Sequence, residues 1–359
     1  MTKYIIKRLL LALLILFGVS IILYALVRVM PADFIADEYY KTHTNVDVDS
    51  GELKQIMLDN NLESLEDVWA QGYSDLWNKV FRNGEPVLDA DGNIKTTAPF
   101  FAATKSIVAG YCNWLGNFVT GDFGTSFKYN RPVTDVILQY MGYSFTISLI
   151  SLVLQLLISI PLGIKSACNQ YGKLDYITTV LTMIGISFPS FFFGSIVIKI
   201  FAVDLGWFPA GGIGSSDPLD QLWHMVLPIL VLTILSVGSM MRYTRTNTLE
   251  VLNADYIRTA RAKGLSESTV VYKHVFRNTL IPLVTTLAGI IPSLFGGAMI
   301  TETVFDLPGI GNIAYQCMLV GDVPFIMAYN MFLAVLTVIG ILLTDLMYAV
   351  VDPRVKLGK

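Results

Sequence analysis

The chain has 359 residues, of which 53% are hydrophobic and only 15% are charged, and its formal net charge is -3. This composition is too apolar for a water-soluble globular domain and predicts an integral membrane protein. Its three cysteines, Cys112, Cys168 and Cys317, match neither a zinc-site spacing nor a disulfide framework.

The first predicted element is an apolar run at residues 9–27, which contains no charged residue. As a helix, such a run is about 28 Å long, close to the thickness of the hydrocarbon core of a bilayer. Lys3, Lys7 and Arg8 precede it and no convincing cleavage site follows it. We therefore expect an uncleaved first span with a cytoplasmic N-terminus.

Residues 31–140 form the one large polar region, with 16 Asp or Glu against 8 Lys or Arg. The positive-inside rule places this region outside the cytoplasm, and we expect it to be mixed and partly helical. The Asp91-Gly92 pair predicts a hairpin turn. A calcium loop is disfavoured at this turn, because the glycine and the distal glutamate of an EF-hand are absent from their positions.

Five further apolar segments predict five more spans, at about 142–166, 176–203, 225–241, 281–303 and 326–350. The Lys and Arg residues between them place both chain ends in the cytoplasm. The predicted fold is therefore an all-α integral membrane protein with six transmembrane helices. Its predicted parts are an N-terminal segment with the first span (1–30), an extracytoplasmic region (31–140), a five-helix core (141–350) with a loop at 242–280, and a cytoplasmic tail (351–359).

Residues 242–282 are a basic island between two apolar segments, with seven Lys or Arg against three acids. Asn253 is the predicted N-cap of a short helix, and Asp255 lies in its first turn, where the helix dipole favours an acid. Arg261 and Lys263 lie in the last turn before Gly264. The predicted helix is about 15 Å long, and its alanines permit close approach of another surface. A second helix is predicted to begin at Ser266.

Several chemical motifs are missing from the sequence. It contains no GxxxxGK[ST] phosphate loop, HExxH or GxSxG, which excludes nucleotide hydrolysis by that loop and disfavours an intramembrane hydrolase. His43 and His224 are predicted outside and His274 inside, so we expect no shared metal site. Charged residues of the apolar segments, including Glu302, lie near the predicted span ends, where long side chains can reach the interface. This pattern disfavours an ion-coupled carrier.

Several motifs follow one another in a defined order. They are GDFGTSF (121–127), RPV (131–133), PLG (161–163), GWFPAGG (206–212), HMVLP (224–228), DYIRTARAKGL (255–265), ETVFDLPGIGN (302–312) and VDPRV (351–355). In this order they resemble the B-type permease subunit of binding-protein-dependent ABC importers of the oligopeptide, dipeptide and nickel family. The resemblance covers the first span and about 106–359. The chain departs from the general EAAxxxG loop pattern, and residues 66–105 look like an insertion.

The resemblance implies a permease that moves peptides by alternating access across the bacterial cytoplasmic (inner) membrane. It implies four kinds of partner: a second permease subunit of related sequence, two cytoplasmic ATPase subunits that bind ATP and magnesium, an extracytoplasmic substrate-binding protein or lipoprotein, and membrane lipid. It implies no cofactor in this chain and no nucleic acid. The short helix would couple the permease to an ATPase through Asn253, Ala254, Asp255, Tyr256, Arg258, Thr259, Ala260, Arg261, Ala262, Lys263, Gly264 and Leu265.

Other interpretations remain open. The same machinery serves nickel or another small solute in some branches, and the substrate-binding residues are not assigned. From another class, the chain would be a stand-alone channel, an ion-coupled carrier or a membrane scaffold, and the basic island would only lie on the inner leaflet. The insertion either helps to dock the binding protein or is a solvated surface. Cys112 and Cys317 either form a disulfide or remain free thiols.

Overall fold

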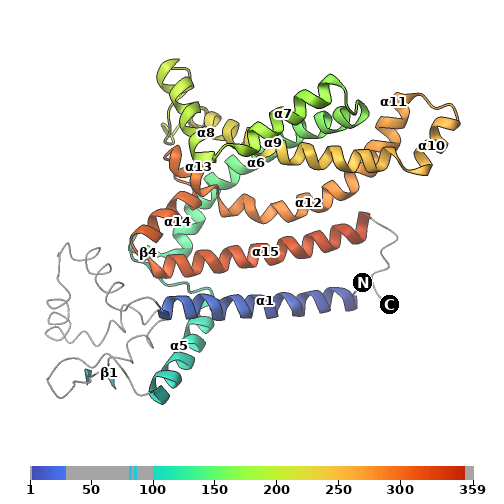
Figure 1. Cartoon of the computed structure of the whole chain (residues 1–359). Helices are drawn as coiled ribbons and strands as arrows, with labels where there is room; N and C mark the ends of the chain where they lie inside the picture. Colours follow the sequence, from blue (N-terminus) through green and yellow to red (C-terminus); the bar gives the residue numbers. More distant parts are fainter. Residues whose placement is uncertain (1, 30–80, 83–84, 87–99, 352–359) are drawn as a thin grey trace. The chain divides into compact units, whose positions relative to one another are not determined.

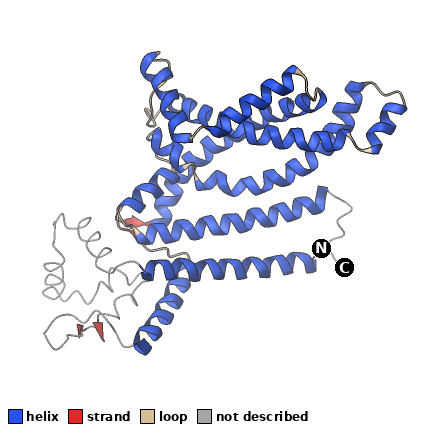
Figure 2. Ribbon diagram, in the orientation of Figure 1, coloured by secondary structure: helices blue, strands red, loops and turns tan. Residues whose placement is uncertain are grey.

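A computed structural model describes residues 2–29, 81–82, 85–86 and 100–351 of the chain. Most of the described part is helical (Figure 2). Two very short antiparallel strand pairs accompany the helices: β1 (Phe81–Arg82) with β2 (Glu85–Pro86), and β3 (Thr125–Ser126) with β4 (Arg131–Pro132). The predicted turn at Asp91-Gly92 and most of the predicted insertion lie outside the described residues.

The helical elements follow one another from α1 to α15, with two π-helical segments, η2 and η3. They are α1 (Thr2–Val29), α5 (Phe100–Thr120), α6 (Val133–Cys168), α7 (Lys173–Ser187), α8 (Ser190–Val197), η2 (Ile198–Asp204), α9 (Pro218–Leu252), α10 (Asp255–Ala262), α11 (Glu267–Thr269), η3 (Val270–Val275), α12 (Phe276–Gly296), α13 (Met299–Val304), α14 (Ile310–Leu319) and α15 (Val323–Val351).

Four of the described helices are long and apolar enough to cross a membrane, at Ile6–Leu26, Val133–Cys168, Pro218–Leu252 and Val323–Met347. Two further pairs of helices meet this test together but are bent, so the described residues hold four spans, or up to six if each bent pair is one span. The predicted all-α membrane fold is confirmed. The predicted number of six spans depends on the two bent pairs.

Proline explains both bends. Helix α7 meets the stretch of α8 and η2 at an angle of 102°. Phe188, at this bend, has extended dihedrals. It precedes Pro189, and a residue before proline is disfavoured in the helical region. The second bend is 43°, between Leu287 and Gly289. Pro292 lies four residues beyond this bend, and its ring clashes there with the carbonyl of the preceding turn.

The chain divides into two compact units. The first contains Met1–Leu9, Tyr140–Ile313 and Leu336–Lys359. Its apolar core gathers Leu227 and Val231 of α9, Ile147 of α6 and Phe305 after α13. Within this unit α7 packs along α9 (Figure 1), and these helices lead into the α10 loop.

The second unit contains Leu10–Gln139 and Ala314–Val335. Aromatic side chains join α1 to α5 there, with Tyr24 at 5.5 Å from Tyr111 and 5.9 Å from Trp114 between ring centroids. Offset and edge contacts of this kind add to the stabilisation from apolar burial. The hydroxyls of Ser20 and Tyr111 lie 2.7 Å apart and share a hydrogen bond between the same two helices.

A buried carboxylate holds the GDFGTSF segment within the second unit. Asp322 precedes α15, accepts from the Phe325 N–H at 3.2 Å as a helix cap, and also accepts from the Ser126 hydroxyl and the Lys128 N–H. Burial raises the pKa of the neighbouring Cys317 thiol, and the Asp322 charge raises it further. Cys317 and the exposed Cys112 are both free thiols, so the alternative of a disulfide between them is not realised.

Candidate coupling site

Asn253 ends α9 instead of starting α10. Its backbone N–H and its side-chain amide both donate to the Leu249 carbonyl, at 3.2 and 3.0 Å. Ala254 is the N-cap residue of α10 and supplies no side-chain hydrogen bond. The prediction that Asn253 is the N-cap is therefore wrong. Helix α9 continues to Leu252, and the side-chain amide of Asn253 gives the Leu249 carbonyl a second hydrogen bond at the end of that helix.

Helix α10 runs from Asp255 to Ala262, about 12 Å at the usual helical rise. Gly264 follows it with a φ of +76°, and its N–H donates to the Arg261 carbonyl at 2.9 Å. Such a left-handed residue is a common helix stop, which glycine adopts without steric cost. Ser266 then caps α11 by accepting from the Thr269 N–H. The predicted glycine stop and the predicted start at Ser266 are confirmed.

One face of α10 packs against its own chain. Ile257 is fully buried and Ala260 is 7% exposed, and both pack against Val270 and Val275 of η3. Positions three apart lie on the same side of a helix, so these two residues define the inner face. The small side chain of Ala260 therefore allows close packing within the loop, whereas the sequence pattern assigned it to close packing against a partner.

The other face of α10 is open. Tyr256 is 50% exposed at the edge of this face, and Leu265, beyond the end of α10, is 40% exposed. Nothing lies within 4 Å of the position that a Gly264 Cβ would occupy. Of the predicted interface, Ala254 is half-buried, and the exposed members are Asn253, Asp255, Tyr256, Arg258, Thr259, Arg261, Ala262, Lys263, Gly264 and Leu265.

Two ion pairs of unequal strength lie in the α10 loop. Arg258 and Asp255 are 3.8 Å apart and both are highly exposed, which is a loose contact. Arg261 donates to both oxygens of Glu267, at 3.1 and 2.6 Å. These hydrogen bonds raise the pKa of the Arg261 guanidinium above its ordinary value. Arg261 therefore joins the end of α10 to the start of α11.

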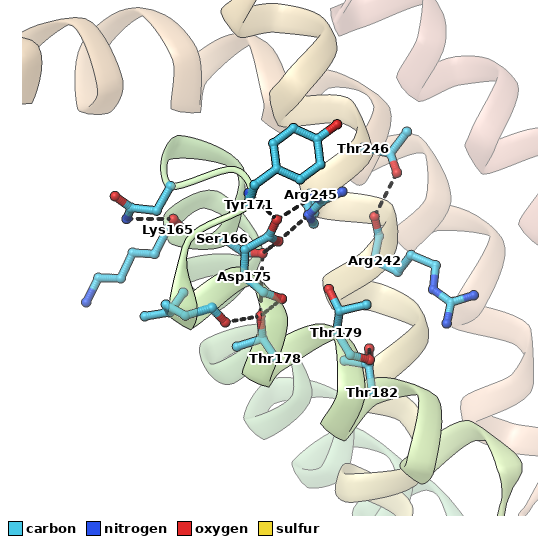
Figure 3. A network of polar contacts seen from close by, with 12 residues as sticks. Lys165, Ser166, Tyr171, Asp175, Thr178, Thr179, Thr182, Arg242, Arg245 and Thr246 are labelled. Atoms are coloured by element: carbon cyan, nitrogen blue, oxygen red, sulfur yellow. Dashed lines mark hydrogen bonds and ion pairs between the residues drawn. The ribbon is translucent and has the colours of Figure 1, made fainter.

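A buried ion pair ties the base of this loop to two other helices (Figure 3). Arg245 of α9 donates to both oxygens of Asp175 on α7, at 2.6 Å from Nε and 2.8 Å from Nη2. The same carboxylate accepts from the Tyr171 N–H at 2.9 Å and from the Ser166 hydroxyl at the end of α6. We call these four residues the Asp175 network. They fix the ends of α6, α7 and α9 together beside the loop.

Gly163 allows the close approach that the Asp175 network needs. A Cβ at this position would lie 2.8 Å from the Thr244 Cβ and 2.9 Å from the Met241 carbonyl oxygen. Only glycine therefore fits between α6 and α9 at this point without a shift. The PLG motif thus marks a helix contact one turn before Ser166.

A second buried carboxylate, which we call the Glu302 clasp, closes the segment after α12. Glu302 is 1% exposed. It accepts from the Ser144 hydroxyl at 2.7 Å and from the N–H groups of Ala298 at 2.9 Å and Asn312 at 3.0 Å. The Ser144 oxygen in turn accepts from the Ile310 N–H at 2.8 Å. The expectation that Glu302 reaches out to the membrane interface is therefore wrong, because its carboxylate is buried and accepts hydrogen bonds from three polar groups of the chain.

Sequence reasoning missed the roles of both carboxylates. Asp175 and Arg245 are 70 positions apart, and Ser144 and Glu302 are 158 apart. Local periodicity carries no information about such pairs. The available signal was the presence of an acid inside or beside a predicted span, since such groups are buried only with partners. Among the described residues, no group of three or more His, Cys, Asp or Glu is placed to hold a metal ion.

Comparisons with known proteins match most of this structure. Residues 159–357 match the family described as "Binding-protein-dependent transport system inner membrane component". The oligopeptide transport system permease protein AppB of Bacillus subtilis is 43% identical over 251 residues, which cover 68% of this chain and 79% of AppB. The oligopeptide permease protein OppB of Haemophilus influenzae is 34% identical, covering 68% of this chain and 79% of OppB. The dipeptide permease protein DppB of Alkalihalophilus pseudofirmus is 33% identical, and the match covers 68% of this chain and 80% of DppB.

Proposed function

Because the chain belongs to the family of binding-protein-dependent transport system inner membrane components, we propose that it forms half of the translocation pathway of an ATP-driven peptide importer. Peptides are the proposed cargo because the permeases named above are designated for oligopeptides or dipeptides. The order of motifs from GDFGTSF to ETVFDLPGIGN supports the B-type subunit. A second permease subunit of related sequence supplies the other half.

The proposed energy source is a pair of separate ATPase subunits, which hold the ATP and magnesium, and α10 is the proposed contact with one of them. The observation that carries this proposal is the division of α10 into two faces. Ile257 and Ala260 fix the helix to its own chain, while Asp255, Thr259 and Ala262 remain exposed on the other side. A helix that is held at one face and open at the other is suited to bind a groove.

The remaining proposed partner is an extracytoplasmic substrate-binding protein or lipoprotein, which delivers the peptide to the side opposite α10. This arrangement requires both chain ends and the α10 loop to be cytoplasmic. The excess of Lys and Arg in residues 242–282 supports that orientation. The orientation is measured by labelling the single-cysteine variants Ser268→Cys and Ser216→Cys with a membrane-impermeant thiol reagent. In intact cells only Ser216→Cys is expected to react.

The docking of α10 is tested with Ala262→Trp, which adds bulk to the exposed face without entering the buried one. Co-purification of the ATPases and ATP-dependent peptide uptake are both expected to fall at least tenfold, while the amount of permease in the membrane stays unchanged. Ser268→Trp is the matched control, since Ser268 is exposed in the same loop but lies outside α10. Normal ATPase association in Ala262→Trp would refute the docking role of this face.

The substrate is tested separately with the complete transporter in proteoliposomes and the binding protein outside. Uptake of radiolabelled oligopeptides is expected, with no competition from Ni²⁺. Uptake of Ni²⁺ without peptide uptake would replace the proposed cargo while leaving the role of α10 intact. Solute uptake that persists without any ATPase would instead favour a stand-alone channel or carrier.

A further inference from the structure

An apolar groove of about 490 Å³ lies between α6 and the η3 segment, outside the α10 face and the Asp175 network. Along α6 its wall is a stripe of side chains that includes Val153, Leu157, Ile160 and Ile164. Their spacing of three to four residues places them on one side of the helix. Tyr272 and Phe276 form the opposite wall. The groove belongs wholly to the first unit.

The length of the groove corresponds to one leaflet of a bilayer. From Val153 to Ile164 the stripe extends about 17 Å along α6, and the hydrocarbon core of a bilayer is about 30 Å thick. Leu157 is 66% exposed, although it belongs to a helix long enough to cross the membrane. The wall is therefore open on the side of α6 that a membrane would cover.

The mouth of the groove is basic. Lys165 lines it at the end of α6, and its ammonium group extends away from the Asp175 network (Figure 3). Among the described residues, the nearby carboxylates are already engaged: Asp175 with Arg245, and Glu267 with Arg261. Tyr272 is 68% exposed at the same mouth, and tyrosines commonly lie at the level of lipid headgroups.

We propose that this groove binds one acyl chain of an anionic phospholipid, with the headgroup phosphate beside Lys165 and Tyr272. The lipid comes from the leaflet that faces the α10 loop. An apolar wall of one-leaflet length and a lysine that pairs with no described carboxylate complement an anionic lipid in shape and charge. A partner helix would complement the wall but would leave the cation unpaired.

The site has a consequence for the α10 loop. Tyr272 and Phe276 belong to the helical stretch that starts with α11, and η3 also supplies Val270 and Val275 to the core beneath α10. A lipid seated against η3 therefore stabilises the support of α10. π-helical segments are rare and occur frequently at functional sites. This inference rests on the membrane fold and is independent of the proposed cargo and of the ATPase contact.

The test measures lipid retention by native mass spectrometry of the full chain with its accompanying subunits. The protein is taken from nanodiscs of dioleoylphosphatidylcholine that contain dioleoylphosphatidylglycerol as the minor lipid. One retained phosphatidylglycerol per chain is expected. Lys165→Gln is expected to lower its retention about fivefold, which corresponds to about 1 kcal/mol for one cation at an anionic lipid surface. Leu157→Trp fills the groove and is expected to abolish retention.

Two matched controls separate the site from general effects of charge and bulk. Lys173→Gln removes an exposed lysine that does not line the groove, and Leu154→Trp adds bulk at a position of α6 outside the wall. Both are expected to retain the lipid as the unchanged chain does. Equal retention by Lys165→Gln, Leu157→Trp and the unchanged chain would overturn the proposal.

A second measurement tests whether the groove is covered by another subunit instead of a lipid. Leu157→Cys in the assembled transporter is expected to react with a lipid-soluble maleimide and to form no crosslink with another subunit. A crosslink between Leu157→Cys and a partner permease would overturn the lipid proposal, because the groove would then be an interface between subunits. Lys165→Gln is expected to fold normally, since its side chain is exposed.

Discussion

The Asp175 network and the Glu302 clasp both bury a carboxylate in the first unit, but they satisfy it differently. Asp175 receives two hydrogen bonds from the Arg245 guanidinium, together with one hydroxyl and one N–H. Among the described residues, Glu302 accepts from no cation and receives hydrogen bonds from one hydroxyl and two N–H groups. The first arrangement joins three helices through side chains. The second arrangement, around Glu302, relies mainly on backbone N–H groups that donate to the carboxylate.

This difference explains the sequences around the two carboxylates. The clasp requires glycines, because a Cβ on Gly309 would lie 2.3 Å from the Glu302 carboxylate and one on Gly311 would lie 2.8 Å from the Met299 backbone. The Asp175 network requires one glycine, Gly163, where α6 and α9 approach each other. A carboxylate held by backbone thus produces a glycine-rich motif. A carboxylate held by a distant arginine leaves almost no local pattern.

The largest expected effect comes from breaking the charged arrangement. Asp175→Ala or Arg245→Ala is expected to lower the free energy of unfolding by about 1.5–3 kcal/mol, the range for hydrogen bonds to charged groups. The value lies below that of a fully buried pair, because the Arg245 side chain is 24% exposed. Titration with a denaturing detergent measures it. The double variant is expected to lose less than the sum, and strictly additive losses would show that the two residues are not coupled.

A smaller effect is expected from Glu302→Gln. Glutamine keeps one acceptor oxygen but points an NH₂ group at a backbone or hydroxyl donor, so one donor of the clasp loses its partner. The expected loss is about 1–2 kcal/mol in the same detergent titration. Asp306→Asn is the control, since Asp306 belongs to the same motif but is exposed. A loss as large as that of Asp175→Ala would contradict the distinction between the two arrangements.

The helix contact that brings Ser166 toward Asp175 is tested with Gly163→Ala. The added methyl group overlaps Thr244 and Met241, and an overlap of this size costs about 1 kcal/mol or more. Gly142→Ala on the same helix is the comparison, because nothing lies within 4 Å of its Cβ position. This control is expected to be neutral or stabilising, since alanine favours a helix over glycine. Equal stability of the two variants would argue against a tight α6–α9 contact.

The smallest effect is expected from Glu267→Gln, which breaks an ion pair that solvent reaches. The side chains of Arg261 and Glu267 are 43% and 63% exposed. Exposed pairs of this kind contribute less than about 1 kcal/mol and are screened by salt. The difference from the unchanged chain is expected to disappear at high ionic strength. A loss of stability that does not depend on salt would show that this ion pair behaves like the buried Asp175 network.

The sequence predicts the local features of this protein well. All six apolar segments fall on helices, and the stop at Gly264 and the start at Ser266 are as expected, because composition and capping chemistry act over a few residues. The assignment of Asn253 failed because it depended on where α9 ends. The face of Ala260 and the burial of Glu302 depend on partners far along the chain. No periodicity within a single segment encodes such partners.

The bend near Pro292 divides the helical stretch from Glu267 to Val304 into two arms that are not collinear. The arm from Glu267 to Leu287 is roughly 30 Å long at 1.5 Å per residue, and the next arm leaves it at 43°. When a straight helix rotates about its own axis, its far end stays in place. When a bent helix rotates about the axis of one arm, the end of the other arm moves sideways. A rotation of the Glu267–Leu287 arm would therefore move the second arm sideways, together with Ala298, whose N–H donates to the Glu302 carboxylate.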